Sequence, residues 1–168
     1  MKKNEIETIL SMCLEKEEYE YSIPSNEDWK KLEKKVDFMF PETFKTFIDF
    51  MSVFSFPGDI YNVLEDNNNG NDSILQVYMH ECQYPEWDKS MIPFYGIGNG
   101  DYFCICKNDA KIYYYYQDEL KSECYSENMD DWILDIDIHA YKPAKYCHCH
   151  YYYLLIHYIY LQEKKILT

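Results

Sequence analysis

The chain has 168 residues, of which 47% are hydrophobic and 18% aromatic, so it can bury a core without disulfides and is not disordered. Its formal net charge is −14 at pH 7, and all 16 basic residues are lysine. This charge repels nucleic acid and anionic membrane surfaces and favours a basic protein as the partner. A strongly acidic balance is also a common solubility device, so an acidic surface without a partner is the competing interpretation.

The sequence indicates the cellular compartment through its cysteines and its longest apolar run. The seven cysteines include no C-x-x-C pair, which fits neither a disulfide framework nor a structural zinc site. Glu5 and Glu7 occupy the place where a secretory signal would need apolar residues. The run over residues 151–161 is too short to span a bilayer. We therefore expect a cytoplasmic protein with no membrane contact.

Three amphipathic helices are predicted before residue 56. The first begins behind an Asn4 cap that Glu7 completes, the second behind Ser25, and the third near Pro41. Their apolar faces consist of Ile6, Ile9, Leu10, Cys13 and Leu14, then Trp29, Leu32 and Val36, then Phe44, Phe47, Ile48 and Met51. This spacing is typical of helices that pack on a core.

A sheet of four or more strands is predicted over residues 60–116. Its first strand is expected at 60–64, followed by a polar loop at 66–73 and a segment at 74–78 that fits a strand or a short helix. Three further strands at 92–95, 102–106 and 112–116 form a meander. Alternation places Tyr102, Cys104 and Cys106 on one face of the middle strand.

The glycine cluster at 96–100 separates the first two strands of this meander. It lacks the G-x-G-x-x-G spacing, and a predicted strand follows it where a phosphate-binding loop would need a helix. Asp101 would also repel a phosphate. We interpret the cluster as a tight connection between strands.

The C-terminal part is predicted to be helical. Ser126 is the expected cap of a helix whose face carries Met129, Trp132, Ile133 and Ile136, and a further helix is possible at 151–165.

An ordered set of landmarks resembles a known family. The set comprises Trp29, Leu32-Glu33, Phe40-Pro41-Glu42, Phe44, Phe47-Ile48, Ile92-Pro93-Phe94, residues 100–104, Ile112, Tyr115, Met129 and Trp132-Ile133. In order and spacing it is similar to the SUKH superfamily, the group of bacterial immunity proteins related to fungal cell-wall assembly regulators. The resemblance covers about 26–135 of a single domain at 1–168. Residues 53–56 replace the usual asparagine-glycine pair, and the tail at 141–168 is unassigned.

The resemblance implies an α+β fold, with helices packed on a mostly antiparallel sheet, and no catalytic centre or cofactor. It further implies an immunity protein that neutralises a cognate protein toxin by direct binding. The acidic composition fits a basic toxin, such as a nuclease. Two alternatives remain: a regulatory scaffold that binds host signalling proteins, and an enzyme that uses scattered carboxylates.

The acidic residues suggest where a partner would bind. No lysine occurs between Asp59 and Asp88, and eight acids stand against Lys121 alone from Asp118 to Asp137. The candidate partner-binding residues are Asp66, Asp72, Glu81, Glu86 and Asp88. A solvated face without a partner is the alternative interpretation.

Two groups of cysteine and histidine residues could suggest a metal or redox site. Cys147, His148, Cys149 and His150 are adjacent, so their side chains diverge and would need Cys124 or His139 to complete a tetrahedral site. Cys104 and Cys106 share a strand face, where burial would raise the thiol pKa and reduce reactivity. We expect no stoichiometric zinc and no catalytic residues.

Overall fold

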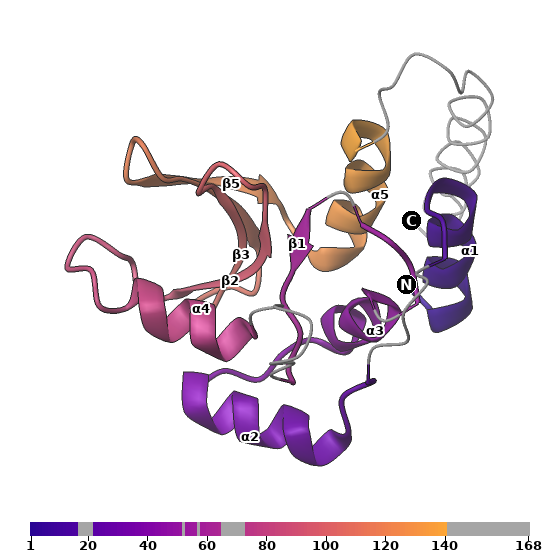
Figure 1. Ribbon diagram of the computed structural model, residues 1–168, viewed down its shortest axis with the longest axis horizontal. Helices are drawn as coiled ribbons and strands as arrows, with labels where there is room; N and C mark the ends of the chain where they lie inside the picture. Colours follow the sequence, from indigo (N-terminus) through magenta and orange to yellow (C-terminus); the bar gives the residue numbers. More distant parts are fainter. Residues whose placement is uncertain (17–21, 52, 57, 65–72, 141–168) are drawn as a thin grey trace, which may run out of the picture.

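The computed structural model describes residues 1–16, 22–51, 53–56, 58–64 and 73–140, and these contain five helices and five strands (Figure 1). The helices are α1 (Lys3–Cys13), α2 (Asn26–Val36), α3 (Glu42–Met51), α4 (Ile74–Glu81) and α5 (Met129–Ala140). The strands are β1 (Asp59–Ile60), β2 (Met91–Gly96), β3 (Tyr102–Cys106), β4 (Ile112–Tyr116) and β5 (Lys121–Ser126). The predicted α+β class is confirmed.

The sheet is an antiparallel meander in which spatial order follows chain order, from β1 to β5. The glycine-rich connection between β2 and β3 is confirmed as a tight turn. Gly98 has φ +88° and Gly100 has φ +93°, in the left-handed region that other residues rarely adopt. The chain can therefore reverse direction within five residues.

The core is centred on Trp132 of α5, whose side chain is fully buried. Its ring meets Phe47 of α3 at a centroid distance of 5.2 Å, and Phe94 and Phe103 of the sheet at 5.0 Å and 5.3 Å. The interplanar angles of 73–88° give edge-to-face contacts, which are favourable beyond the area they bury. One side chain thus joins both helices to the sheet.

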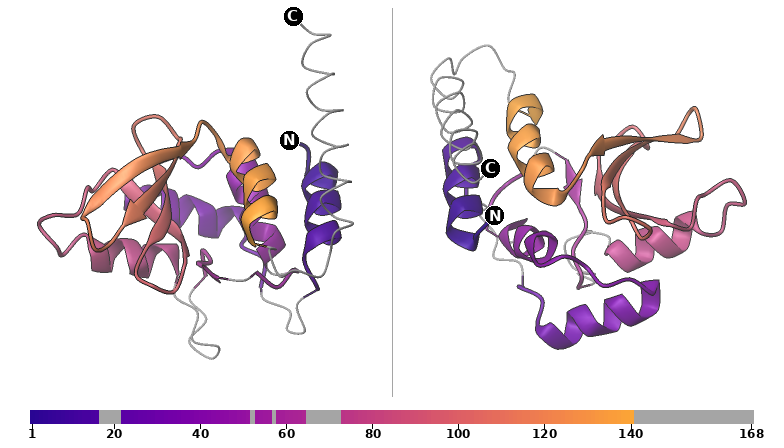
Figure 2. Two further views of the ribbon diagram at one scale, coloured as in Figure 1. Left: turned by 90° about the horizontal axis from the view of Figure 1, so that it is seen from above. Right: turned by 180° about the vertical axis from the view of Figure 1, so that it is seen from behind.

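The other helices surround this core in two groups (Figures 1 and 2). α1 lies on the outside, against α3 and α5, and α5 also contacts β5. α4 lies beside β2, and α2 packs next to α4. Consequently α4 and the loop that follows it at 82–90 are held directly against the sheet.

Glu33 of α2, one of the landmark residues, is an acid that is buried between α2 and α3. Its carboxylate is 6% exposed, accepts the Phe40 N–H at 3.1 Å and pairs with the Lys45 ammonium of α3 at 2.8 Å. Burial alone would lower the pKa of Lys45, but the hydrogen bond and charge of Glu33, with help from Glu42, outweigh burial and raise that pKa. The pair locks α2 to α3.

Two of the expected helix caps are wrong and one is confirmed. The Glu5 carboxylate accepts the Lys2 N–H at 2.7 Å, so α1 begins at Lys3 and not behind Asn4. Asn128, not Ser126, caps α5, because its side-chain oxygen accepts the Asp131 N–H at 2.9 Å. At α2 the Ser25 hydroxyl accepts the Asp28 N–H at 3.3 Å, as predicted.

The strand boundaries also differ from the prediction. β1 ends at Ile60, because the Asn62 side chain accepts the next two backbone N–H groups and turns the chain before Leu64. The ambiguous segment at 74–78 is helical, started by reciprocal hydrogen bonds between Ser73 and Gln76. The sheet also extends to Ser126 through β5, which was not predicted. The possible helix at 151–165 and most of the polar loop at 66–73 lie outside the described residues.

Candidate partner-binding surfaces

The α4–β2 loop, residues 82–90, carries two of the predicted partner-binding acids. Glu86 and Asp88 are exposed, on either side of Trp87, which is only 4% exposed. The Trp87 ring lies 4.6 Å from the ring of Tyr115 and 6.1 Å from that of Tyr102. Trp87 therefore anchors the loop on the sheet while its neighbours face outward.

Glu81 has a different environment from the exposed surface that was expected. Its side chain is 6% exposed and accepts a hydrogen bond from the Tyr102 hydroxyl at 3.0 Å. Burial, followed by the charge and hydrogen bond of Glu81, raises the pKa of Tyr102 well above its ordinary value. The expectation that Glu81 is a freely exposed charge is wrong, because α4 turns this face toward the sheet. Its role in binding a partner remains a prediction.

The sheet face beneath this loop contains the two strand cysteines. Cys104 and Cys106 are buried with Trp87, Met91 and Tyr115. Burial, together with the nearby negative charge of Glu81, raises the pKa of the Cys104 thiol well above its ordinary value. The core interpretation of these cysteines is confirmed.

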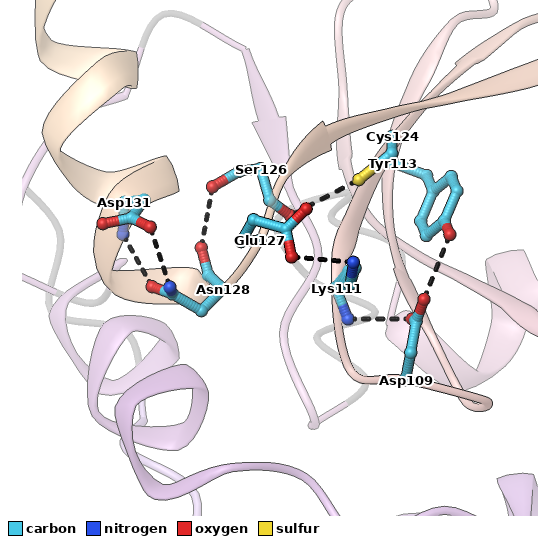
Figure 3. Close-up of polar contacts among 8 residues, drawn as sticks. All are labelled: Asp109, Lys111, Tyr113, Cys124, Ser126, Glu127, Asn128 and Asp131. Atoms are coloured by element: carbon cyan, nitrogen blue, oxygen red, sulfur yellow. Dashed lines mark hydrogen bonds and ion pairs between the residues drawn. The ribbon is translucent and has the colours of Figure 1, made fainter.

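The turn from β5 into α5 adjoins the β3–β4 hairpin (Figure 3). The Lys111 ammonium pairs with the Glu127 carboxylate at 2.7 Å, and the Tyr113 hydroxyl donates to Asp109 at 3.1 Å. The Ser126 hydroxyl donates to the Asn128 carbonyl at 2.9 Å, next to the cap of α5. These contacts place the first turn of α5 at the same end of the sheet as the α4–β2 loop.

Lysines offset the acidic charge at this end. The Lys107 N–H donates to the Ser90 carbonyl at 2.8 Å, and its ammonium donates to the Tyr78 hydroxyl at 2.6 Å. The connections 82–90, 107–111 and 127–128 together contain Glu86, Asp88, Asp109 and Glu127 against Lys89, Lys107 and Lys111. With four acids against three lysines, these three connections together are close to neutral, although Glu86 and Asp88 belong to a segment without lysine in the sequence.

The opposite end of the sheet is formed by the β2–β3 turn at 97–101 and the β4–β5 turn at 117–120. These two connections contain Asp101, Asp118 and Glu119 and no lysine. Ile97 is 40% exposed and Leu120 is 54% exposed, so each turn displays one aliphatic side chain. We call Ile97, Asp118, Glu119 and Leu120 the tip surface.

Asp101 holds the two turns together. Its carboxylate accepts the Gln117 N–H at 2.9 Å, the Tyr114 hydroxyl at 2.8 Å and the Asn99 side-chain amide at 2.9 Å. Burial alone would raise the pKa of this carboxyl, but the three hydrogen bonds outweigh burial and lower that pKa. The tip surface is thus fixed to the sheet.

Sequence reasoning did not single out the tip surface. Its acids are separated by 16 or more residues from Asp101, and only the strand pairing brings them together. A usable signal was present: Ile97 lies between two glycines, and Leu120 follows two acids in a polar turn. An aliphatic residue at the tip of a turn has no obvious part in a core.

Several predicted site residues cannot be placed. Asp66, Asp72 and the Cys147–His150 cluster lie outside the described residues. Within the part of the chain that the structure describes, no three histidine, cysteine, aspartate or glutamate side chains are grouped so that they could hold a metal ion. No helix in that part is both long enough and apolar enough to cross a membrane.

Comparison with known proteins identifies a family. The family model described as "SUKH_5: SMI1-KNR4 cell-wall" matches residues 4–138, so it extends the landmark region toward the N-terminus and includes most of α1 and α5. No curated protein and no solved structure shows a significant match to the chain.

Proposed function

Because the chain belongs to the SUKH superfamily, we propose that it is a bacterial immunity protein that neutralises a cognate toxin by binding it. Membership of this superfamily is the observation that carries the proposal, since its bacterial members typically act in this way. The protein works as a stoichiometric inhibitor in the cytoplasm of the toxin-producing cell. It catalyses no reaction and needs no cofactor.

The charge of the chain supports a basic toxin as the partner. With a net charge of −14 and no arginine, the protein attracts a basic surface and repels nucleic acid and anionic membranes. A nuclease fits this description, because its substrate-binding surface must attract phosphate. Attraction of this kind accelerates association more than it strengthens the final complex.

The position of the exposed acids supports binding through connections of the sheet. Glu86 and Asp88 project from a loop anchored by buried Trp87, and Asp118 and Glu119 project from a turn anchored through Asp101. Loops on a rigid scaffold commonly carry binding residues. Partner contact at either end would require little rearrangement of the protein.

The test uses the product of the gene that adjoins the gene of this protein, which the proposal predicts to encode the toxin. The purified full-length chain is mixed with that toxin, and complex formation is followed by size-exclusion chromatography and calorimetry. We expect a stoichiometric complex, loss of toxin activity in proportion to the protein added, and survival of cells that express both genes. Toxin activity that is unaffected by a molar excess of the protein would contradict the proposal.

A regulatory scaffold is the second candidate, because the matching family model carries a cell-wall description. Such a scaffold would bind host signalling proteins in cells that lack the toxin gene. Affinity purification from toxin-free cells separates the two functions. Specific, stoichiometric recovery of one host protein there, together with no protection against the toxin, would favour the scaffold.

A further inference from the structure

We propose that the tip surface, formed by Ile97, Asp118, Glu119 and Leu120, is the face that contacts the toxin, and that it fits an apolar depression rimmed by lysine or arginine. This inference rests on the proposed function and assigns that function to one end of the sheet. It differs from the sequence-based candidates, which were Asp66, Asp72, Glu81, Glu86 and Asp88.

The apolar part of the surface is the first argument. Ile97 and Leu120 are two of the exposed large hydrophobic side chains among the described residues, and they come from two turns that Asp101 holds together. Folding gains little from a side chain that stays about half in water, because apolar stabilisation follows the area removed from water. A partner that covers both side chains would gain the free energy of apolar burial that folding leaves unused.

The backbone conformation of Leu120 is the second argument for a contact surface at the tip. Leu120 has φ +51°, in the left-handed region that disfavours a side chain with a Cβ atom. A glycine or asparagine would adopt this conformation at lower cost. The leucine therefore contributes an exposed apolar side chain at a position where the fold itself would favour another residue.

Order at the tip lowers the cost of binding. Asp101 fixes both turns through three hydrogen bonds, and a Cβ atom on Gly100 would lie 3.1 Å from the Gln117 side chain, so the turns are in close contact. A contact surface that is ordered before binding loses less conformational entropy on association. The two turns that carry the aliphatic side chains are thus held against each other before a partner binds.

Charge complementarity selects the occupant. Asp118 and Glu119 directly precede Leu120, and Lys121, which follows it, pairs with Glu119 at 2.6 Å and with Glu123 at 3.4 Å. With Lys121 included, the tip has three acids against one lysine, whereas the connections at the opposite end have four acids against three lysines, so the acidic charge of the tip is the less compensated. A second copy of the chain would bring like charges together, whereas a basic rim around an apolar depression would match both features.

The test compares three charge-reversed pairs that alter the net charge equally. The pairs are Asp118→Lys with Glu119→Lys at the tip, Glu86→Lys with Asp88→Lys on the α4–β2 loop, and Glu7→Lys with Glu27→Lys on α1 and α2. Each substitution changes the local charge by +2, so each pair takes the formal net charge from −14 to −14 + 4 = −10. Differences among the pairs therefore report the position of the charge and not its total.

Two apolar variants complete the set. Leu120→Gly and Leu120→Asn remove the aliphatic side chain while keeping a residue that tolerates the left-handed backbone. We expect both to melt no lower than the wild type and to bind the toxin about tenfold more weakly, mainly through faster dissociation. The tip pair should associate at least about fivefold more slowly than the helix pair at low salt, and this difference should shrink as salt rises.

The outcomes separate the inference from the proposed function. If the wild type binds the toxin, and the tip pair and both Leu120 variants bind it as tightly and as fast as the helix pair does, the inference is overturned while the proposed function stands. Loss of binding confined to the loop pair would overturn it as well. If the wild type itself does not bind or inhibit the toxin, the proposed function fails and the inference fails with it.

Discussion

Replacement of Glu81 by lysine should destabilise the fold, although Glu81 was expected to be an exposed contact residue. The side chain is 6% exposed and accepts a hydrogen bond from the Tyr102 hydroxyl at 3.0 Å. Tyr102 in turn stacks on Tyr115 and meets the Trp87 ring edge-to-face. Glu81→Lys removes the acceptor and places an ammonium where a carboxylate was. Because a buried charge without a partner is costly, we expect a loss of about 3–5 kcal/mol in the free energy of unfolding.

This loss is large enough to measure by thermal or urea denaturation. For a chain of this size, each 1 kcal/mol corresponds to about 2–4 °C, so the midpoint should fall by about 6–20 °C. Glu81→Gln keeps an acceptor for Tyr102 and should lose only about 1–2 kcal/mol. Glu86→Lys is the matched control on the exposed loop and should stay within about 0.5 kcal/mol of the wild type. A Glu81→Lys protein as stable as the Glu86→Lys control would refute the reasoning and indicate that the Glu81 side chain is exposed to solvent.

Three further predictions concern the other buried or hydrogen-bonded groups. Glu33→Ala should cost about 3 kcal/mol, because the Phe40 N–H loses its acceptor, whereas Glu33→Gln should cost about half as much; equal losses in urea denaturation would show that the acceptor does not matter. Since the folded pKa of Asp101 is lowered, its contribution to stability is complete above the ordinary value of 3.8 and is lost as the pH falls below it. The Asp101→Asn protein should therefore lose less stability than the wild type between about pH 4 and pH 2, and parallel curves would contradict this. Burial, aided by Asp59 for Tyr95 and by Asp101 for Tyr114, raises the pKa of each phenol to about 12. The neutral phenols thus stabilise the fold below about pH 10, and this stability is lost as the pH rises toward 12. Tyrosine absorbance in a pH titration should show phenols that ionise only when the chain unfolds. Complete tyrosine ionisation in the folded chain near pH 10 would contradict the raised pKa values.

The parts of the fold that depend on neighbouring residues could be predicted from sequence. Ser25 and Asp28 form their cap within one turn, and the bounds of β3 and β4 match the predicted runs, because alternation within five residues determines them. The prediction of the α1 cap was wrong, and the reason is also local. Two acids, Glu5 and Glu7, were both in reach of a backbone N–H, and the structure uses Glu5.

Features that depend on pairing across the sheet could not be predicted in the same way. β5 is mostly exposed and polar, so its strand conformation comes from its hydrogen bonds to β4 and not from an apolar pattern. The burial of Glu81 likewise depends on how α4 packs against Tyr102, which lies 21 residues away. The tip surface depends on both the strand order and the hydrogen bonds of Asp101. The acid count along the chain likewise gave no sign that Lys107 donates to Ser90 and Tyr78, or that Lys111 pairs with Glu127.

Hydrogen exchange of the toxin complex tests the central claim most directly. The full-length protein is labelled alone and with the adjacent-gene toxin in slight excess, and protection is compared between residues 97–101 with 117–120 and residues 82–90. We predict slower exchange in the two turns of the tip on binding, with little change in the α4–β2 loop. Protection confined to residues 82–90, with the turns at 97–101 and 117–120 exchanging as in the free protein, would contradict the assignment of the tip as the toxin-binding face.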